Sequence, residues 1–338
     1  MKTVLACGLA LLVLAAALAL IPAEAQSPRR GGGERIAVVA QAIEAFDPRD
    51  PARTVFGALK FRGGLVLTSS HRHFGGISAL HVEPDGERFV AVTDKGRWLR
   101  GRIVYRDERP IAIADADIAP ILGADGRPLS RRGWYDTESL AEDGGTFYVG
   151  IERVNEIVRL NFGRDGVKAR AVPIAVPPAV KALPYNRGLE CLAMAPRNGP
   201  LAGTLIAISE RGLDERGNIQ GFLIGGAGGA FALKRSEDFD VSDCTLAPRG
   251  RLLVLERRFT WLSGVAMRIR SIPLARVQPG ALLDGVELMS ADMAHQIDNM
   301  EGLAVHRAGD GQLVLTLVSD DNFSALQRTL LLQFTLAE

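Results

Sequence analysis

The chain has 338 residues, of which 47% are hydrophobic, 23% charged and only 6% aromatic. Its 40 Lys and Arg nearly balance its 39 Asp and Glu, so the formal net charge is +1 at pH 7. This balance argues against a nucleic acid or an anionic membrane surface as the main partner. The length is ample for a large core, and no break in composition divides the chain into two folded domains.

The first 25 residues have the pattern of a secretory signal peptide. Lys2 precedes an apolar run over residues 4–21, and Ala23-Glu24-Ala25 forms a small-residue cleavage site. We expect cleavage before Gln26 and a mature protein that is periplasmic or secreted, monomeric and without a stable membrane partner. The alternative is an uncleaved membrane anchor, because an apolar run of about 18 residues lies at the threshold for spanning a bilayer.

The segment after the cleavage site reads as a tether followed by strands. Residues 26–34 are rich in Ser, Pro, Arg and Gly, which indicates a flexible tether. We expect residues 35–338 to form a single domain. The runs 35–40 and 56–67 are strand-like, and we expect the second to supply the outer strand of the last sheet. It would thereby join the two ends of the chain and remove an exposed sheet edge.

The loop 70–76 contains two histidines, His71 and His73, separated by one residue. In an extended loop they would lie on one side, where they could contact a substrate. The alternative is that both are solvated loop residues.

From residue 76 onwards one pattern recurs five times. A short apolar strand carries one polar residue at a fixed register, and a second apolar strand follows that ends on an acid. The polar residues of the first strands are Ser78, Glu138, Glu190, Ser242 and Glu301. The acids of the second strands are Asp94, Glu152, Glu210, Glu256 and Asp320, and the cations next to four of them are Lys95, Arg153, Arg211 and Arg257.

These repeats predict an all-β propeller. Their apolar runs are short and are broken by Gly, Pro and Asp, which is typical of strands. Radially repeated sheets of this size form a propeller, and five copies predict five blades, with six as the alternative.

The polar residues of the first strands form a candidate metal site. The first strand of each blade lines the central channel, so these residues would form a ring of three carboxylates and two hydroxyls. Buried carboxylates must take up protons, pair with cations or bind a metal. Ligation by oxygen alone favours Ca²⁺ over zinc or copper. The alternative is that the acids accept hydrogen bonds from the backbone of the neighbouring blade and only brace the channel.

The acids and cations of the second strands are candidates for catalysis. The acids could serve as further metal ligands or as a general base, and the cations could bind an anionic substrate. The alternative is that the acid-base pairs are salt bridges between blades.

Two cysteines remain after signal cleavage, Cys191 and Cys244. An oxidising compartment would permit them to pair. Cys191 lies one residue beyond its ring position and Cys244 two beyond, which puts them on opposite faces of their strands. We therefore expect two buried free thiols.

Several of these motifs resemble the bacterial phytase-like family described as having esterase-like activity. They include Asp-Thr-Glu-Ser-Leu at 136–140, Gly-Leu-Glu at 188–190 and Asn-Met-Glu-Gly-Leu at 299–303. The resemblance covers about residues 55–336 and implies a propeller. Secreted calcium-activated nucleotidases are more distantly similar, with five blades and a central Ca²⁺ held by one Ser or Glu per blade. True propeller phytases have six blades and several Ca²⁺ ions, so the resemblance does not imply phytate as the substrate.

The two resemblances together imply a calcium-dependent hydrolase of phosphoesters or carboxyl esters that acts on a small anionic substrate. The alternative is a non-catalytic propeller that binds a ligand or a protein and has a structural central Ca²⁺.

Overall fold

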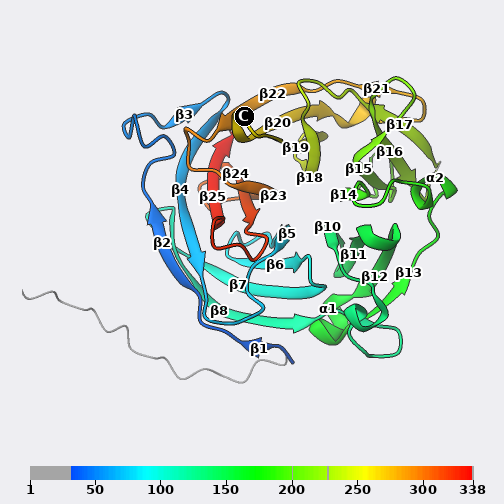
Figure 1. Cartoon of the computed structure of the whole chain (residues 1–338), viewed down its shortest axis with the longest axis horizontal. Coiled ribbons are helices and arrows are strands. Elements are labelled where there is room, and N and C mark those ends of the chain that lie inside the picture. The colour runs from blue at the N-terminus through cyan, green and yellow to red at the C-terminus, as the bar shows by residue number, and fades with distance from the viewer. Residues whose placement is uncertain (1–31, 200, 227, 337–338) are drawn as a thin grey trace, which may run out of the picture. The chain divides into compact units, whose positions relative to one another are not determined.

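The structure is a computed structural model that describes residues 32–199, 201–226 and 228–336. Within these residues five sheets surround a common axis, and the first strand of each sheet lies innermost (Figure 1). This arrangement confirms the all-β propeller and the prediction of five blades. We number the blades one to five by the order of their innermost strands along the chain.

The predicted signal peptide lies outside the described residues, as does most of the predicted tether. Glu34, which we placed in the tether, instead forms β1 (Glu34–Arg35), and this strand pairs with the outer strand of blade one. Within the described part of the chain, no helix has the length and apolar character needed to cross a membrane.

The first three blades each contain four consecutive antiparallel strands and an added edge strand. Blade one has β5 (Ile77–Val82), β6 (Arg88–Thr93), β7 (Arg97–Arg106) and β8 (Arg109–Pro120), with β1 at its edge. Blade two has β10 (Thr137–Asp143), β11 (Thr146–Ile151), β12 (Glu156–Asn161) and β13 (Arg170–Pro173), with β9 (Leu122–Gly123) at its edge. Blade three has β14 (Leu189–Met194), β15 (Leu205–Leu213), β16 (Ile219–Ile224) and β17 (Gly229–Leu233), with β21 (Leu282–Leu283) at its edge.

The last two blades complete the ring. Blade four has β18 (Asp240–Ala247), β19 (Arg251–Thr260), β20 (Gly264–Pro273) and β22 (Val286–Asp292). Blade five has β23 (Asn299–Arg307), β24 (Leu313–Asp320), β25 (Thr329–Leu336), β4 (Leu59–Thr68) and β2 (Val39–Ile43), and β3 (Val55–Phe56) pairs with β4. The short helices in the connections are η1 (Leu129–Arg132), η2 (Glu152–Val154), α1 (Phe162–Asp165), η3 (Gly166–Lys168), α2 (Pro178–Lys181) and η4 (Leu274–Arg276).

The two ends of the chain close the ring in blade five. Strand β4 from the N-terminal side pairs antiparallel with β25 from the C-terminal side, as the sequence predicted. The closure leaves no exposed edge on β25, because β4 and β2 continue the sheet outwards.

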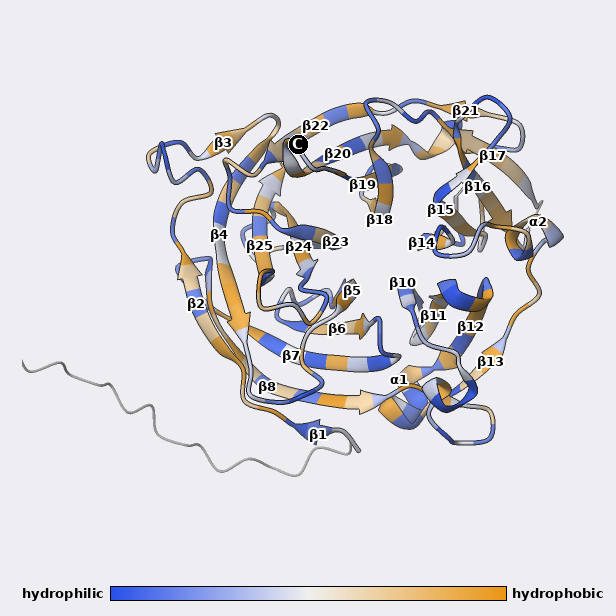
Figure 2. Cartoon of the chain, viewed as in Figure 1, coloured by the Kyte–Doolittle hydropathy of each residue, from blue (hydrophilic) through white to orange (hydrophobic). Residues whose placement is uncertain are grey.

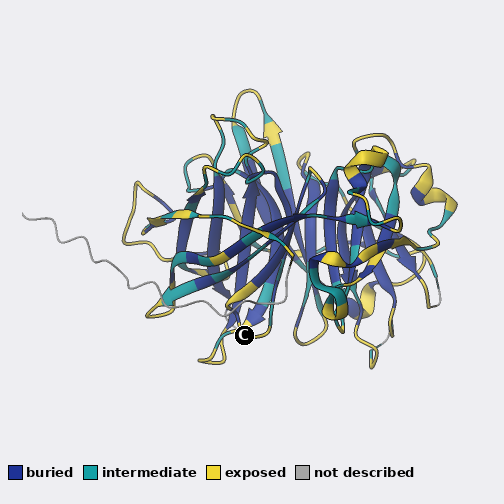
Figure 3. Ribbon diagram, turned by 90° about the horizontal axis from the view of Figure 1, so that it is seen from below, coloured by how far each residue is buried: buried dark blue, intermediate teal, exposed yellow. Residues whose placement is uncertain are grey.

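The core lies between blades. Hydrophobic and polar residues are mixed along strands such as β7 (Figure 2), and apolar side chains reach both faces of a blade. On β7, Trp98 packs with residues of blade two and its neighbour Leu99 with residues of blade five. Five clusters of buried apolar residues result, one in each space between neighbouring blades. The strands are buried over most of their length, and exposed residues are concentrated in the loops at their ends (Figure 3).

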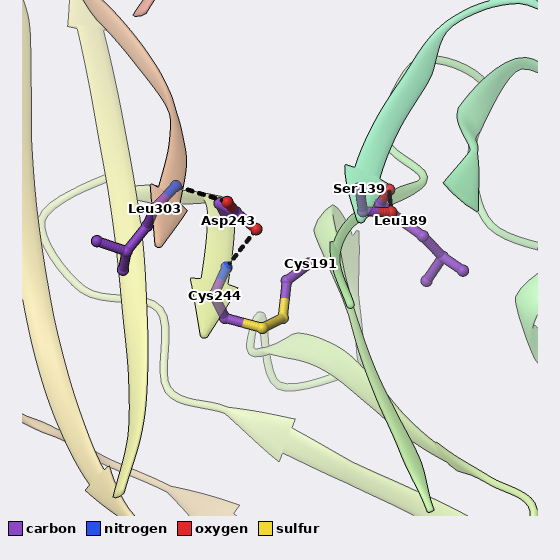
Figure 4. The surroundings of a disulfide bond; sticks show 6 residues. All are labelled: Ser139, Leu189, Cys191, Asp243, Cys244 and Leu303. Carbon is purple, nitrogen blue, oxygen red and sulfur yellow. Dashed lines mark hydrogen bonds between the residues drawn. A yellow bond between two sulfur atoms is a disulfide. The ribbon is translucent and has the colours of Figure 1, made fainter. Parts of the chain in front are cut away.

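The innermost strands repeat one contact from blade to blade. In blades two, three and four the residue one position after the ring residue bonds to the innermost strand of the next blade. In blade two this residue is Ser139, whose hydroxyl donates to the Leu189 carbonyl of blade three at 3.0 Å. In blade four it is Asp243, whose carboxylate accepts from the Leu303 amide of blade five at 2.7 Å (Figure 4).

At the interface between blades three and four the same contact is a disulfide, and our prediction of two free thiols was wrong. Cys191 and Cys244 are bonded, with their Cα atoms 5.1 Å apart (Figure 4). They do lie on opposite faces of their strands. Neighbouring blades, however, pack the front of one sheet on the back of the next, so opposite faces are what this bond requires.

Candidate metal centre in the central channel

The five predicted ring residues share one backbone feature, which is a β-bulge. In every blade the pairing of the first strand with the second skips one residue. The skipped residues are Ser78, Glu138, Glu190, Ser242 and Glu301, and all five are buried. The structure thus places all five at one register.

The two serines of this ring are already hydrogen bonded. Ser242 Oγ donates to the Met300 carbonyl of blade five at 3.0 Å. Ser78 Oγ lies 3.4 Å from the Gly76 carbonyl and also bonds to the carboxyl of Glu138. Both hydroxyls therefore brace the channel, and the glutamates remain as its ionisable groups.

The three ring glutamates interact electrostatically. Burial raises the pKa of Glu138 well above its usual range, and Glu301 raises it further. Burial likewise raises the pKa of Glu190, with the next largest effect from Glu138. Burial also raises the pKa of Glu301, while the guanidinium of Arg257 opposes this change. A cation in the channel would relieve this repulsion.

The second row of predicted residues requires a correction in blade four. The residue before each bulge pairs with Thr93, Ile151, Ser209, Glu256 or Ser319 in the second strand. The next residue along the chain is therefore the equivalent one in each blade, and this set is Asp94, Glu152, Glu210, Arg257 and Asp320. Glu256 does not belong to the row of acids, and Arg257 takes the place of the carboxylate. Our alignment was off by one residue because Glu256-Arg257 looks in sequence like the acid-cation pairs of the other blades, whereas the backbone pairing puts Glu256 one position before the row.

Glu256 has a structural role. Its side chain is fully buried, and its Oε2 accepts hydrogen bonds from Arg268 at 2.8 Å and from Arg270 at 2.6 Å. Both arginines lie on β20 of the same blade. With its charge compensated twice, Glu256 is not available as a metal ligand or a base.

Three glutamates from blades two and three converge into a candidate metal triad. Glu152, Glu190 and Glu210 each offer one carboxylate oxygen, and these oxygens lie within 4.8 Å of one another. Glu152 Oε1 accepts from the Gly188 amide at 2.8 Å, and Glu210 forms an ion pair with Arg187 at 3.0 Å. Glu190 forms no hydrogen bond or ion pair with any residue that the structure describes.

The triad has the electrostatics of a site for a cation. Burial raises the pKa of Glu152 to about 7, against the effect of the bond from the Gly188 amide. Glu190 is buried among like charges and has no direct partner within residues 32–199, 201–226 and 228–336. Three carboxylates in so small a space suit a hard divalent ion that prefers oxygen, such as Ca²⁺. The triad draws one member from the predicted ring and two from the second row, a grouping that the repeat pattern alone did not reveal.

Arg257 binds two channel carboxylates, one of which belongs to the triad. Its guanidinium forms ion pairs with Glu301 at 3.1 Å and with Glu210 at 3.4 Å. Asn299 completes the contact, because its Oδ1 accepts from Arg257 and its Nδ2 donates to Glu301 at 2.8 Å. Arg257 is thus held within the channel and is not free to bind a substrate.

The remaining acids of the second row lie in blades one and five. Burial raises the pKa of Asp94, which pairs with Lys95 at 2.9 Å. Burial and the nearby Glu301 raise the pKa of Asp320 to about 9, although the Asn322 amide donates to this carboxyl. Asp320 therefore retains its proton at neutral pH.

Of the predicted substrate-binding cations, Arg153 is the least compensated. Lys95 is paired with Asp94, and Arg211 forms a close ion pair with Asp240. Arg153 lies 4.0 Å from Asp136. Its guanidinium lies over the rings of Tyr135 and Tyr185, with 4.4 and 5.7 Å to the ring centroids.

The two predicted histidines are joined to neighbours other than the triad. His71 Nε2 lies 3.3 Å from Glu34 of β1. His73 Nε2 lies 3.0 Å from Arg97 of β7, and burial and this arginine lower the pKa of His73. In the described part of the chain, neither histidine bonds to a channel carboxylate.

Sequence reasoning missed three polar residues that adjoin the site. Asp136 and Asn299 stand two positions before the ring residues of blades two and five. Gly188 stands at the same position in blade three, and Arg187 directly precedes it. The repeat pattern contained this signal, because the same register holds a polar residue in three of the five blades. Our reading followed only the ring position and the end of the second strand.

Next to the ring the lining of the channel is partly polar and partly apolar. A cavity of about 190 Å³ lies next to the ring and is lined by the innermost strands of all five blades. Leu80, Leu140, Leu192 and Leu303 contribute the residue two positions after the ring. Leucines of four blades thus follow the ring along the channel, and His81, Glu142 and Thr245 line the same cavity.

Comparison with known proteins identifies one family. The family model "Phytase-like: Esterase-like activity of phytase" matches residues 72–323. No curated protein matches significantly. Among solved structures, the glutaminyl cyclase of Myxococcus xanthus is similar at 14% identity, with 78% of this chain and 92% of that chain covered and a TM-score of 0.41. An α-L-arabinofuranosidase from Podospora anserina is similar at 10% identity, with coverages of 82% and 97% and a TM-score of 0.48. Neither likeness bears on function.

Proposed function

Because the chain belongs to the phytase-like family described as having esterase-like activity of phytase, we propose that it is a calcium-dependent hydrolase of anionic esters. Its site would lie at the acidic part of the central channel. The substrate class is a small phosphoester or carboxyl ester.

The observation that carries this proposal is the buried Glu190, which has no partner in the part of the chain that the structure describes. A buried carboxylate without a hydrogen bond or a counter-ion is costly, and a folded protein retains one where a ligand compensates it. Glu152 and Glu210 lie close enough to share a cation with Glu190. Carboxylate oxygens are the ligands that Ca²⁺ prefers.

Glu152, Glu190 and Glu210 would hold the ion, which when bound supplies a Lewis acid that neutralises oxygens of the substrate. Arg153 would bind the anionic group of the substrate, because it is adjacent to Glu152 in the chain and is weakly paired. Tyr135 and Tyr185 hold its guanidinium in place. Asp320 carries a proton at pH 7 and would donate it to the leaving group.

We also propose export of the protein. The pattern of residues 1–25 supports removal of a signal peptide, and the disulfide between Cys191 and Cys244 suits a periplasmic or extracellular location. Determination of the N-terminal residue of the mature protein tests this, with Gln26 as the expected result.

A non-catalytic binding propeller is the second candidate. It is favoured by the tip of the β19–β20 hairpin, where Phe259, Trp261 and Leu262 are 60%, 95% and 102% exposed. Exposed apolar residues grouped in this way are typical of contacts with a partner. In this case the calcium would be structural, and the protein would lack hydrolytic activity.

A substrate panel separates the two candidates. Phosphomonoesters, nucleotides, inositol phosphates and carboxyl esters are assayed with the purified protein in Ca²⁺ and after chelation. We expect hydrolysis of at least one class that requires Ca²⁺. Glu190→Gln should lower this activity by at least about tenfold, whereas the exposed carboxylate variant Glu215→Gln should not change it. No hydrolysis across the panel would reject the hydrolase and leave the binding propeller.

A further inference from the structure

The acidic channel contains a cation supplied by the chain itself. At the register where blades one, two, three and five carry Asp94, Glu152, Glu210 and Asp320, blade four carries Arg257. The backbone pairing in blade four is the same as in the other four blades. The exception is therefore in the side chain and not in the fold.

The guanidinium joins carboxylates of two different blades. It lies 3.1 Å from Glu301 of blade five and 3.4 Å from Glu210 of blade three. Asn299 contacts both Arg257 and Glu301 and so fixes the pair. An arginine stays charged at any physiological pH, so this compensation is permanent.

The contacts divide the channel acids into two groups. Glu301 and one oxygen of Glu210 are occupied by Arg257. Glu190 has no such partner among the described residues, and one of its oxygens lies within 4.8 Å of an oxygen of Glu152 and of an oxygen of Glu210, whose Oε2 accepts from Arg187. A second divalent ion beside Glu301 would be repelled by a guanidinium that already binds this carboxylate.

We infer that Arg257 occupies the place of a second metal ion, so that the channel binds one divalent cation, at Glu152, Glu190 and Glu210. Arg257 is a positioning residue, because it acts on the ion through Glu210 and Glu301. This inference rests on the proposed calcium site and adds to it the number of ions and the residue that sets this number.

Calcium stoichiometry tests the inference. The full mature chain is stripped with chelator, and bound Ca²⁺ is measured by equilibrium dialysis for the wild type, Arg257→Lys and Arg257→Glu. We expect one ion for the wild type and for Arg257→Lys, which retains the positive charge. Arg257→Glu restores the carboxylate of the other blades, and we expect two ions. One ion in a folded Arg257→Glu, or two in the wild type, would overturn the inference.

Thermal stability gives a second test that does not require Arg257→Glu to fold. In Arg257→Gln, Ca²⁺ can take over the lost compensation of Glu210 and Glu301, so the rise in Tm caused by Ca²⁺ should exceed that of the wild type. An equal rise in both proteins would mean that Arg257 is only a brace and would reject the inference. Absence of any calcium binding in the wild type would reject the metal centre itself, and the inference with it.

Discussion

At the scale of single residues, the channel is a set of buried carboxylates with unequal partners. Glu301 and Glu210 are bound by Arg257, whereas Glu190 has no partner in the described part of the chain. Burial is the largest cause of the raised pKa values of Glu138 and Glu190, and the neighbouring acids raise them further. Without a bound cation the channel carboxyls therefore hold their protons more strongly. Binding of a cation would release these protons.

This arrangement predicts a pH dependence of stability. Burial raises the pKa of Glu152 from 4.5 to about 7 in the folded chain. Its proton therefore stabilises the fold fully below the unfolded pKa, and this contribution is lost as the pH rises through the folded pKa. For Glu152 alone the loss is about 3 kcal/mol, at about 1.4 kcal/mol per pKa unit.

We thus expect the Tm of chelated protein to fall between about pH 5 and pH 8. Saturating Ca²⁺ keeps the same carboxylates ionised, so with Ca²⁺ the fall should be smaller. Melting curves over this pH range, recorded with Ca²⁺ and with chelator, check this expectation. Identical pH dependence in the two series would contradict it.

A substitution of Glu256 should change stability and leave calcium binding unchanged, because the role of Glu256 is structural. Glu256→Gln would deprive Arg268 and Arg270 of their shared buried counter-charge and leave Arg270 only the exposed Asp284 at 3.2 Å. Such a loss typically destabilises a protein by about 3–5 kcal/mol. Chemical denaturation measures this effect. Calcium stoichiometry should stay unchanged in the variant, and a loss of calcium binding without loss of stability would place Glu256 in the metal centre after all.

At the scale of elements, the sequence predicted the innermost strands better than the second strands. The ring residues from Ser78 to Glu301 were found because each bulge places one polar residue in an apolar run. In β19 our alignment was shifted by one residue, so it placed Glu256 in the row to which Arg257 belongs. An acid next to a cation gives the same sequence pattern in either register, although adjacent strand residues point to opposite faces. The triad could not be predicted, since it depends on how β14 and β15 approach η2 in space.

The disulfide between β14 and β18 illustrates the same limit. Alternation along a strand correctly placed Cys191 and Cys244 on opposite faces, but it does not say which faces meet. The packing of blade on blade decides this, and it repeats at Ser139 and Asp243.

The disulfide also makes a prediction about stability. It closes a loop with a sequence separation of 53 residues, and removal of such a bond typically costs about 2–4 kcal/mol. We expect Cys191→Ser/Cys244→Ser to unfold at a lower urea concentration than the oxidised wild type. Reductant should shift the wild type to the same midpoint and leave the variant unchanged. A midpoint of the wild type that does not respond to complete reduction would contradict the prediction.

At the scale of the whole propeller, five nearly equal blades produce an unequal channel. Composition and repeats were enough to predict the fold, the blade number and the closure of β4 on β25, because each rests on patterns local to a blade. Function depends on departures from the repeat, namely Arg257 in place of an acid and the two serines in the ring. Arg257 thereby compensates Glu210 and Glu301, whereas Glu190 of blade three has no partner among the described residues.

The central claim is that the cluster of Glu152, Glu190 and Glu210 binds a divalent cation. The most direct measurement is titration calorimetry of Ca²⁺ into the chelated wild type and into Glu190→Gln, with Glu215→Gln as the control. We predict one Ca²⁺ per chain in the wild type and the control, accompanied by a rise in stability of about 2.7 kcal/mol at 100 times the Kd, and no binding at this site in Glu190→Gln. Absence of binding in the wild type, or unchanged binding in Glu190→Gln, would contradict the claim.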